Sequence, residues 1–494
     1  MQNGTLLAAL DLGSNSFRME IGRYQSGHIE RMEYLKETVR QGSGLDAQKN
    51  LSLDAMERGW ACLSRFAERL HGFKKQQVRA VATQTLREAN NRDAFLTHAQ
   101  SVLGFPIEVI SGHEEARLIY QGVSRLLPYS DEKRLVVDIG GRSTEMILGQ
   151  GYTAHALESY HLGSVAWSNK YFDKGLFTSK AFKTAEIAAL AVLDEALDTF
   201  PPHEWTVAYG SSGTAGAVAE ILGQNGWASG LITRPGLDWL QERLIDAGSI
   251  GKLRLEGIKE DRLAVIGGGL SVLRAIFELF GIEQMLPAQG ALRQGALYDL
   301  IDRQTDASDV RERTVSWLAQ RFSVDTVQAQ RVQQVSAALF EQIAIGDKSR
   351  ERYSQKLVWA SRLHEIGAHI SHERAHHHGG YILDHVDAPG FSIPEQHRMS
   401  RIVMGQRGKL RKLEADLGDE LFAKQLIAMR LAVLLCHARK MPEYQDLELR
   451  FLGHGFELIT PPGWSKRYPQ SAWLLEEEVL AWQKSPWSFR VDWR

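Results

Sequence analysis

The feature that most constrains the fold of this chain is a polar turn that occurs twice, each time directly after an apolar run. The first copy follows Leu6 to Leu10 and reads Asp-Leu-Gly-Ser-Asn-Ser from Asp11 to Ser16. The second follows Leu135 to Val137 and reads Asp-Ile-Gly-Gly-Arg-Ser-Thr from Asp138 to Thr144. Because apolar residues resume after both turns, each copy predicts a strand, a tight turn and a second strand. Such self-similarity predicts two related lobes.

The residues of these turns are suited to phosphate. Glycine lets the backbone approach a ligand closely, and successive amides with serine hydroxyls can form a nest for phosphate oxygens. The aspartate at the strand end can hold a divalent cation, usually through water. One copy alone would equally suit an ordinary hairpin. Two copies in matching positions favour two phosphate-binding loops that face each other across a cleft between the lobes.

Strands and helices alternate between and after the turns, which indicates an α/β fold. We expect a helix from Leu53 to Leu70 and strands from Val78 to Ala82 and from Ile107 to Ile110. A later strand at Val207 ends in the cluster Gly210 to Thr214 and then enters a helix. Three residues of this cluster are therefore further candidates for phosphate contact, namely Ser212, Gly213 and Thr214.

Two adjacent carboxylates stand at the start of the helix that follows Ile110. Ser111 is placed as the N-cap, and Glu114 at the third position beyond it would complete a capping box. Glu115 has no such capping role. We therefore take Glu115 as the candidate catalytic carboxylate, the alternative being a side chain that is merely stabilised by the helix dipole.

Six short sequence motifs resemble those of the exopolyphosphatase and guanosine pentaphosphatase (Ppx/GppA) family. They stand in family order and are Asp11 to Phe17 (DLGSNSF), Thr85 to Arg87 (TLR), Ser111 to Tyr120 (SGHEEARLIY), Val137 to Glu145 (VDIGGRSTE), Gly210 to Thr214 (GSSGT) and Gly290 to Arg293 (GALR). The resemblance implies duplicated α/β lobes of the actin and sugar-kinase type, which are ribonuclease H-like. It also implies that the active site lies in the cleft between the lobes.

The same resemblance implies roles for individual residues. Glu115 would be the general base that activates water. Asp138 and Glu145 would hold Mg²⁺, and Asp11 is a further candidate for this role. The phosphates would be surrounded by Ser14, Asn15, Ser16, Arg87, Gly141, Arg142, Ser143 and Thr144.

One departure from the family concerns Arg142, which stands where the family usually has the third glycine of the second turn. If its side chain points into the cleft, it supplies a guanidinium fork suited to phosphate. If it points outward, it is a solvated loop residue. A positive φ at this position would strain an arginine.

The C-terminal half of the chain has a different sequence pattern. From Asp309 the pattern is helical, with apolar spacing from Val315 to Ile343, after a polar linker from Ile301 to Ser308. We expect a domain boundary near residue 305. The predicted domains are two actin-like lobes at 1–125 and 126–305, a helical HD-like domain at 306–445 and a small α/β tail domain at 446–494.

The helical part resembles the HD-type phosphohydrolases at His364 and Glu365, but a glutamate replaces the aspartate of their His-Asp pair. We therefore do not expect a working metal centre there. A histidine cluster at His376 to His378 and a basic stretch follow, the latter comprising Arg401, Arg407, Lys409, Arg411 and Lys412. This stretch predicts either a groove for a polyanion or a solvated helix face.

Bulk properties limit the setting in which such a chain works. Its net charge is −2, so the whole molecule does not attract nucleic acid or an anionic membrane surface. Two cysteines in 494 residues fit a reducing compartment. Neither a signal peptide nor a membrane span is recognisable. We expect a cytoplasmic protein that binds no nucleic acid, has no membrane insertion and forms a homodimer.

These observations predict an exopolyphosphatase, which removes the terminal phosphate of inorganic polyphosphate as orthophosphate by magnesium-assisted attack of water. The alternative is a guanosine pentaphosphate 5'-phosphohydrolase, because that substrate also ends in a phosphoanhydride. The basic C-terminal stretch favours polyphosphate. A third interpretation is a non-catalytic alarmone sensor, and a fourth is an ATP-dependent kinase that shares the phosphate turns.

Overall fold

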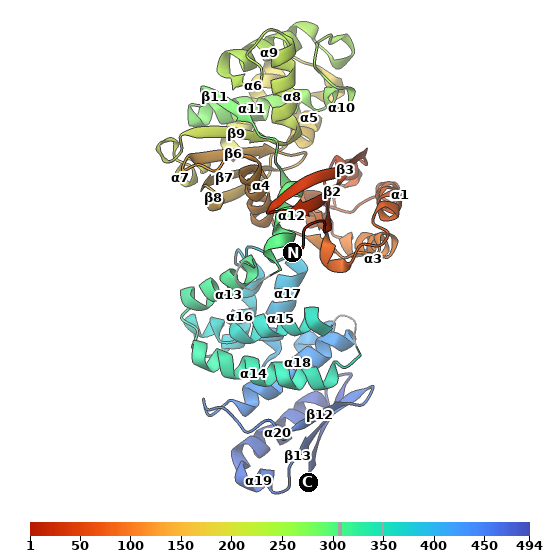
Figure 1. Cartoon of the computed structure of the whole chain (residues 1–494), viewed down its shortest axis with the longest axis vertical. Helices are drawn as coiled ribbons and strands as arrows, with labels where there is room; N and C mark the ends of the chain where they lie inside the picture. The colour runs from red at the N-terminus through yellow and green to blue at the C-terminus, as the bar shows by residue number, and fades with distance from the viewer. Residues whose placement is uncertain (305–308, 347–349) are drawn as a thin grey trace. The chain divides into compact units, whose positions relative to one another are not determined.

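The computed structural model describes residues 1–304, 309–346 and 350–494, and it divides the chain into two compact units (Figure 1). Unit 1 comprises Met1–Asp309 and unit 2 comprises Val310–Arg494. The expected boundary near residue 305 lies outside the described residues. The finer division into four domains stays a prediction.

Unit 1 contains two sheets with the same strand order. The first sheet has the order β3-β2-β1-β4-β5 and the second β8-β7-β6-β9-β11-β10. In each sheet three antiparallel strands are followed by two strands that run parallel to the first of them in sequence, and the second sheet ends in a sixth strand, β10, which is antiparallel to β11. The strands of the first sheet are β1 (Leu6–Leu12), β2 (Ser16–Gln25), β3 (His28–Thr38), β4 (Val78–Ala82) and β5 (Ile107–Val109). Those of the second are β6 (Lys133–Ile139), β7 (Thr144–Gln150), β8 (Thr153–Tyr160), β9 (Val207–Ser211), β10 (Ile232–Thr233) and β11 (Gln284–Pro287).

The repeated turn of the sequence is therefore part of a duplicated sheet, which confirms the predicted α/β fold class. The turn joins β1 to β2 in the first copy and β6 to β7 in the second. Both turns are shorter than the sequence indicated, because Asp11 and Asp138 still belong to their strands. The reason is that the antiparallel pairing continues past the aspartate in each hairpin.

Helices flank the two sheets (Figure 1). They are α1 (Leu53–Arg69), α2 (Gln84–Glu88), α3 (Arg92–Leu103), α4 (Gly112–Leu126), α5 (Ser164–Tyr171), α6 (Ser179–Val192), α7 (Ala196–Thr199), α8 (Ser212–Gln224), α9 (Arg234–Ala247), α10 (Glu260–Leu263), α11 (Ile266–Phe280) and α12 (Leu292–Asp302). The predicted helix α1 begins after Ser52, whose side chain accepts a hydrogen bond from the Ala55 amide. It buries a stripe at three- and four-residue spacing that includes Cys62 and Phe66.

Helix α4 is the element that places Glu115. Ser111 caps it, because its hydroxyl accepts a hydrogen bond from the Glu114 amide over 3.1 Å. Its apolar face, including Ile119, packs on Val136 and Ile147 of the second sheet. Helix α12 lies against α4 so closely that a Cβ atom on Gly295 would stand 1.8 Å from the Leu118 carbonyl oxygen. Only glycine fits at this contact.

Buried ion pairs fix α4 and α12 to each other and to β4. Arg79 of β4 and Arg117 of α4 each pair with Glu114 and with Asp299 of α12. Arg79, Glu114 and Asp299 are each 2% exposed or less. The guanidinium groups hold the pKa of Asp299 and of Glu114 below their ordinary values, even though burial alone would raise both. Glu114 therefore anchors α4, whereas the adjacent Glu115 faces the cleft.

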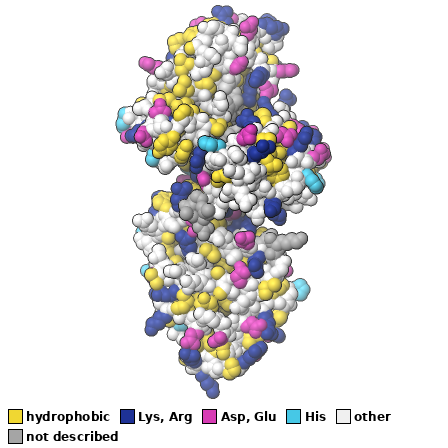
Figure 2. Space-filling model, viewed as in Figure 1, with side chains coloured by type: hydrophobic (Ala, Val, Ile, Leu, Met, Phe, Trp, Pro, Cys, Tyr) yellow, Lys and Arg dark blue, Asp and Glu magenta, His cyan; other side chains and the backbone are white. Residues whose placement is uncertain are grey.

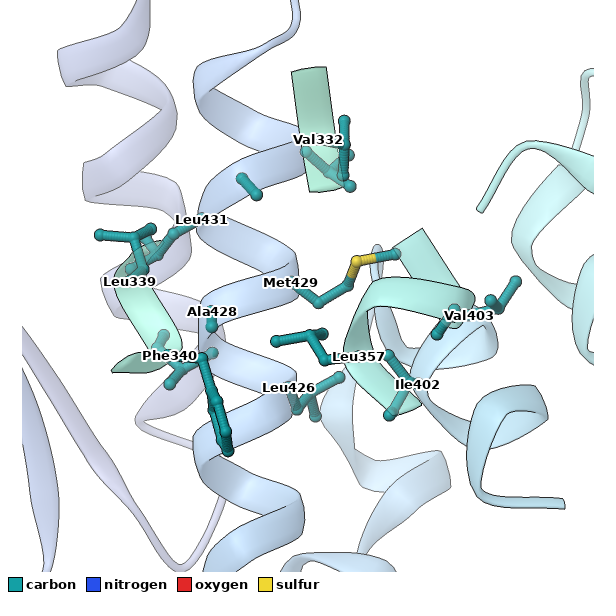
Figure 3. Close-up of a cluster of buried hydrophobic side chains, with 14 of the residues drawn as sticks. Val332, Leu339, Phe340, Leu357, Ile402, Val403, Leu426, Ala428, Met429 and Leu431 are labelled. Atoms are coloured by element: carbon teal, nitrogen blue, oxygen red, sulfur yellow. The ribbon is translucent and has the colours of Figure 1, made fainter. Parts of the chain in front are cut away.

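Unit 2 is helical and ends in a small α/β part. Its helices are α13 (Val310–Arg321), α14 (Thr326–Ile343), α15 (Arg350–Arg362), α16 (Ala375–His385), α17 (Ile393–Gly405), α18 (Glu420–Leu435), α19 (Trp464–Arg467) and α20 (Pro469–Trp482). Its three-stranded sheet has the order β12-β13-β14, formed by β12 (Glu448–Phe451), β13 (Gly455–Thr460) and β14 (Ser488–Trp493). Helix α18 is buried at the centre, where Leu426 and Met429 meet Leu357, Ile402 and Phe340 (Figure 3).

The HD-like segment of unit 2 is held by structural contacts. Glu365 forms an ion pair with Arg439 over 2.7 Å. The buried His364 ring shares a hydrogen bond of 2.8 Å with the Ser361 carbonyl through Nδ1, and burial lowers its pKa. Both cysteines are buried and free. Among the helices of the described residues, none is long and apolar enough to cross a membrane.

We expect Asp299→Asn to destabilise unit 1 by about 3–5 kcal/mol, because it leaves Arg79 and Arg117 buried without one of their counter-charges. Calorimetric unfolding of the full chain measures the loss. Glu204→Gln is the matched control, since Glu204 pairs with Lys133 at a surface where both side chains are more than 40% exposed. Its loss should stay below about 1 kcal/mol. Equal losses for the two variants would contradict the anchoring role of the network.

Candidate active site

The two turns line one cleft in unit 1. Its cavity has a volume of about 80 Å³. Besides the turns, it is lined by Glu115 from α4 and by Ser212 from the start of α8. The four carboxylates singled out in the sequence, Asp11, Glu115, Asp138 and Glu145, all line this cavity and are each 8% exposed or less. Residues from sequence positions more than 130 apart thus meet in one place.

The first turn is fixed from outside by the segment that follows β3. The Ser14 carbonyl accepts a hydrogen bond of 2.8 Å from the Gly42 amide, and the Asn15 carbonyl accepts one of 2.8 Å from the Arg40 amide. The Ser14 hydroxyl accepts a further bond from Thr85. Ser14, Asn15 and Ser16 all line the cavity. The turn is therefore held rigidly against the cleft.

The second turn is fixed by the start of α5. The Gly140 amide donates to the Ser143 carbonyl over 2.9 Å, and the Ser164 amide donates to the Gly140 carbonyl over 2.9 Å. Close approach requires Gly163, because a Cβ atom there would lie 2.6 Å from the Arg142 nitrogen. Gly141, Arg142 and Ser143 line the cavity, whereas the Thr144 hydroxyl is buried and bonds to the Leu162 carbonyl. Thr144 thus supports the turn from behind.

Glu115 is positioned by Arg87. The Arg87 guanidinium stands 3.3 Å from a Glu115 carboxylate oxygen and is itself fixed by the Ile110 carbonyl at 2.7 Å. Gln84 accepts a further hydrogen bond from Arg87. In this structure Arg87 is a partner of the Glu115 carboxylate, and the role at the phosphates that the resemblance assigned to it stays a prediction.

Burial dominates the charge state of the carboxylates. It raises the pKa of Glu115 to about 7, and the nearby Asp11 and Asp138 add to the rise against the opposing effect of Arg87. Burial likewise raises the pKa of Asp138 to about 6. For Glu145, burial and the charges of Glu115 and Asp138 raise the pKa well above its usual range. Such shifts cluster at catalytic sites.

The two copies of the hairpin differ at the residue opposite the aspartate. In the first copy Asp11 faces Arg18 in the strand register, and the two form an ion pair at 3.5 Å. In the second copy Asp138 faces Glu145. The carboxylate of Asp11 is thus already neutralised, whereas the second hairpin presents two carboxylates side by side. Within the described ranges, no group of three or more His, Cys, Asp or Glu side chains is arranged to hold a metal ion.

A pair of hard carboxylate oxygens still suits Mg²⁺, which commonly takes only one or two protein carboxylates and completes its shell with water and substrate phosphate. The charge repulsion that raises the pKa of Glu145 would be relieved by a divalent cation. The donor set at Asp138 and Glu145 therefore fits magnesium better than Asp11 does.

The third phosphate candidate contributes one residue to the cavity. Ser212 lines it and has a left-handed backbone with φ of 69°, which is a strained conformation for serine. The Arg262 guanidinium packs directly on Gly213. A Cβ atom at this position would come within 2.2 Å of Arg262 Nη2. Thr214 is buried and donates to the Ile139 carbonyl over 3.1 Å. The last two residues thus support the cavity wall.

Several residues that line the cavity were not predicted from the sequence, among them Arg18, Ser164 and Arg262. Arg18 could have been predicted from the sequence, because continuing the antiparallel pairing of the hairpin by two residues away from the turn places it opposite Asp11. Ser164 opens α5 against the second turn. Arg262 comes from the short helix α10 and carried no sequence signal. Burial lowers the pKa of Arg262, and the positive charge of Arg18 opposite adds to this effect, so the two arginines concentrate positive charge in the cleft.

Comparison with known proteins agrees with this geometry. The profile of the Ppx/GppA phosphatase family matches residues 21–304, and that of Ppx/GppA phosphatase domain III matches residues 310–479. A guanosine-5'-triphosphate,3'-diphosphate pyrophosphatase from Aeromonas hydrophila is 38% identical to this chain over 99% of both proteins.

Solved structures share the fold of the first part of the chain. An exopolyphosphatase from Cytophaga hutchinsonii superimposes with a TM-score of 0.54 at 22% identity, covering 61% of this chain and 99% of that one. A Ppx/GppA family member from Aquifex aeolicus gives a TM-score of 0.52 at 23% identity, with 61% and 99% coverage. Together with the profile matches over most of its length, these similarities show that the chain belongs to the Ppx/GppA phosphatase family.

Proposed function

We propose that the protein removes the terminal 5'-phosphate of guanosine pentaphosphate, giving guanosine tetraphosphate and orthophosphate. As a member of its family the protein is a hydrolase that acts on phosphoanhydrides. The similarity to the Aeromonas enzyme, which extends over nearly the whole of both chains, supports the guanosine substrate. The observation that carries the chemistry is Glu115, a buried carboxylate that faces two phosphate turns.

The arrangement supplies what phosphoryl transfer to water needs. This reaction requires an aligned water, neutralised charge on the transferred group and little covalent chemistry from the protein. Glu115, with a pKa of about 7, can take a proton from water near neutral pH, and Arg87 holds its carboxylate in place. The amides and hydroxyls of Ser14, Asn15 and Ser143 would bind the phosphate oxygens, a role supported by the place of all three residues in the cavity lining.

Magnesium would be held by Asp138 and Glu145, and it would supply positive charge that offsets the charge on the transferred phosphate. Ser159 orients Glu145 by donating a hydrogen bond of 2.8 Å to it. Arg18 and Arg262 add fixed positive charge on the two sides of the cleft. Because the fold holds these charged groups in place, they need not rearrange during the reaction.

The size of the cavity limits what enters it. About 80 Å³ is well below the ~300–1,000 Å³ of pockets that enclose a whole small-molecule ligand. The cavity therefore suits the terminal phosphate group, while the remainder of the substrate lies beyond its rim.

The sequence argument for polyphosphate is weaker in the structure. Arg401 of the basic stretch is neutralised by Asp416 over 2.7 Å, and Lys412 donates to the Arg407 carbonyl over 3.2 Å. Arg407, Lys409 and Arg411 do line a groove of about 1260 Å³ in unit 2, together with Glu414 and Glu477. On the face drawn in Figure 2, basic and acidic side chains are interspersed. Polyphosphate stays the competing substrate, and a homodimer and a cytoplasmic location stay predictions.

Orthophosphate release from guanosine pentaphosphate and from long-chain polyphosphate, with Mg²⁺ added or omitted, tests the proposal. We expect kcat/KM for the pentaphosphate to exceed that for polyphosphate by about 10-fold or more. Glu115→Gln should reduce turnover by about 10²- to 10⁴-fold, the usual contribution of a general base. Faster release from polyphosphate would contradict the guanosine substrate, and binding without release would indicate a sensor.

Magnesium dependence tests the metal site. Asp138→Ala and Glu145→Ala should each raise the Mg²⁺ concentration for half-maximal phosphate release by about 10-fold or more, because each removes a metal-binding oxygen. Asp11→Asn is the matched comparison and should shift the titration less, since Asp11 is paired with Arg18. The largest shift at Asp11→Asn would place the metal at the first turn instead.

The raised pKa values of Glu115 and Asp138 predict a pH-dependent stability. Both groups hold their protons more tightly in the folded chain, so the stability they contribute is present at acid pH and is lost as pH rises through about 6 to 7. In the presence of a chelator, Glu115→Gln should therefore melt above the wild type by at least about 2 °C at pH 8, and by less at pH 5. Exposed Glu68→Gln is the control. Parallel melting curves across pH would disprove this prediction.

A further inference from the structure

An ion pair between Arg142 and Glu88 links the two lobes beside the active-site cavity. Arg142 belongs to the second turn and lines the cavity, and Glu88 ends helix α2 of the first lobe. Arg142 Nη2 lies 3.1 Å from Glu88 Oε2, and Nη1 lies 3.4 Å from the Gly42 carbonyl oxygen. The side chain thus points into the cleft, as one of the two expectations had it, but it bonds to protein there.

Arg142 keeps a donor that protein does not use. Its Nε atom is buried and has no hydrogen-bond partner among the described residues. A buried N–H without an acceptor is destabilising, and a guanidinium presents its donors in a planar fork that matches phosphate oxygens. The side chain as a whole retains 27% exposure, so a ligand at the rim of the cavity can reach part of it, while Nε itself stays buried until the guanidinium moves.

Glu88 is able to release Arg142 at low cost because it has other partners. Gln84 donates a hydrogen bond to its second oxygen, Oε1. The exposed His161 ring lies 3.8 Å from the same oxygen. Burial would raise the pKa of Glu88, but Gln84, Arg142 and His161 together hold it below its ordinary value, so the group is a carboxylate at neutral pH. Glu88 therefore keeps its hydrogen bond from Gln84 and its neighbour His161 when the arginine leaves.

We propose that Arg142 is an exchangeable phosphate ligand for which Glu88 competes with the substrate. When a phosphate chain enters the cleft, the guanidinium passes from the Glu88 carboxylate to a phosphate oxygen at the rim of the cavity. Glu88 then acts through Arg142 as a positioning residue that lowers the affinity for substrate. The proposal rests on the proposed function only in requiring a substrate that ends in a chain of phosphates.

The exchange predicts opposite effects from the two halves of one ion pair. Arg142→Gly, which restores the residue usual in the resembling family, removes the ligand and should raise KM about 10-fold, with a smaller change in kcat. Glu88→Gln removes the competing charge while keeping an oxygen for Gln84, and it should lower KM by up to about 5-fold. In the Arg142→Gly background, Glu88→Gln should have no effect on KM, because the residue through which it acts is gone.

Three further variants and one binding probe complete the experiment. Arg142→Lys keeps the charge without the fork and should give an intermediate KM. Glu204→Gln, which breaks the exposed ion pair with Lys133, should leave KM unchanged. Binding of inorganic tripolyphosphate to proteins that also carry Glu115→Gln should follow the same order as KM, and this measurement needs no turnover and no guanosine substrate.

A shift of KM in the same direction for Arg142→Gly and Glu88→Gln would overturn the exchange, since it would mean that the ion pair only holds the lobes together. A Glu88→Gln effect that persists in the Arg142→Gly background would overturn it as well. If guanosine pentaphosphate is not hydrolysed but tripolyphosphate affinity still moves in opposite directions, the proposed function is wrong and the exchange is upheld.

Discussion

Four charged side chains, three of them buried, hold the part of the protein on which the active site depends. Arg79, Glu114, Arg117 and Asp299 come from β4, α4 and α12, and they pair with one another in the interior of unit 1. A buried charge is costly unless it is fully paired. Because each of these groups satisfies another, the network tolerates one arrangement of the three elements. That arrangement fixes the start of α4, and with it the direction of Glu115.

The active site has the opposite electrostatic character. Burial, reinforced by repulsion between neighbouring carboxylates, raises the pKa values of Glu115, Asp138 and Glu145 despite the nearby arginines. This repulsion lowers the stability of the folded chain and makes the site receptive to a cation and to a proton. The same protein thus contains one charge cluster whose groups pair with one another and support the fold, and another in which burial outweighs the ion pairs that are present.

The two hairpins differ in the charge that faces the aspartate. Both hairpins keep the aspartate at the end of the first strand and glycine in the turn. The residue across the hairpin differs, since it is Arg18 in one copy and Glu145 in the other. One substitution of charge turns a neutral pair into a carboxylate pair. The first copy thus places an ion pair at the cavity, and the second places there the two carboxylates that are predicted to hold the metal.

The sequence by itself determined the duplicated α/β fold, the two turns and the family, because strand periodicity and turn chemistry are local properties that neighbouring residues fix. It also singled out Glu115, since the capping pattern left that carboxylate without a local role.

The tertiary structure decided the rest. Arg87 stands behind Glu115, Thr144 and Thr214 support the walls, Arg262 enters from a short helix far along the chain, and Arg142 bonds to Glu88. These outcomes depend on which side chains meet across the cleft and how deeply each is buried. Both follow from how elements far apart in the sequence pack together, as α4 does between the sheets, and no local pattern encodes this packing.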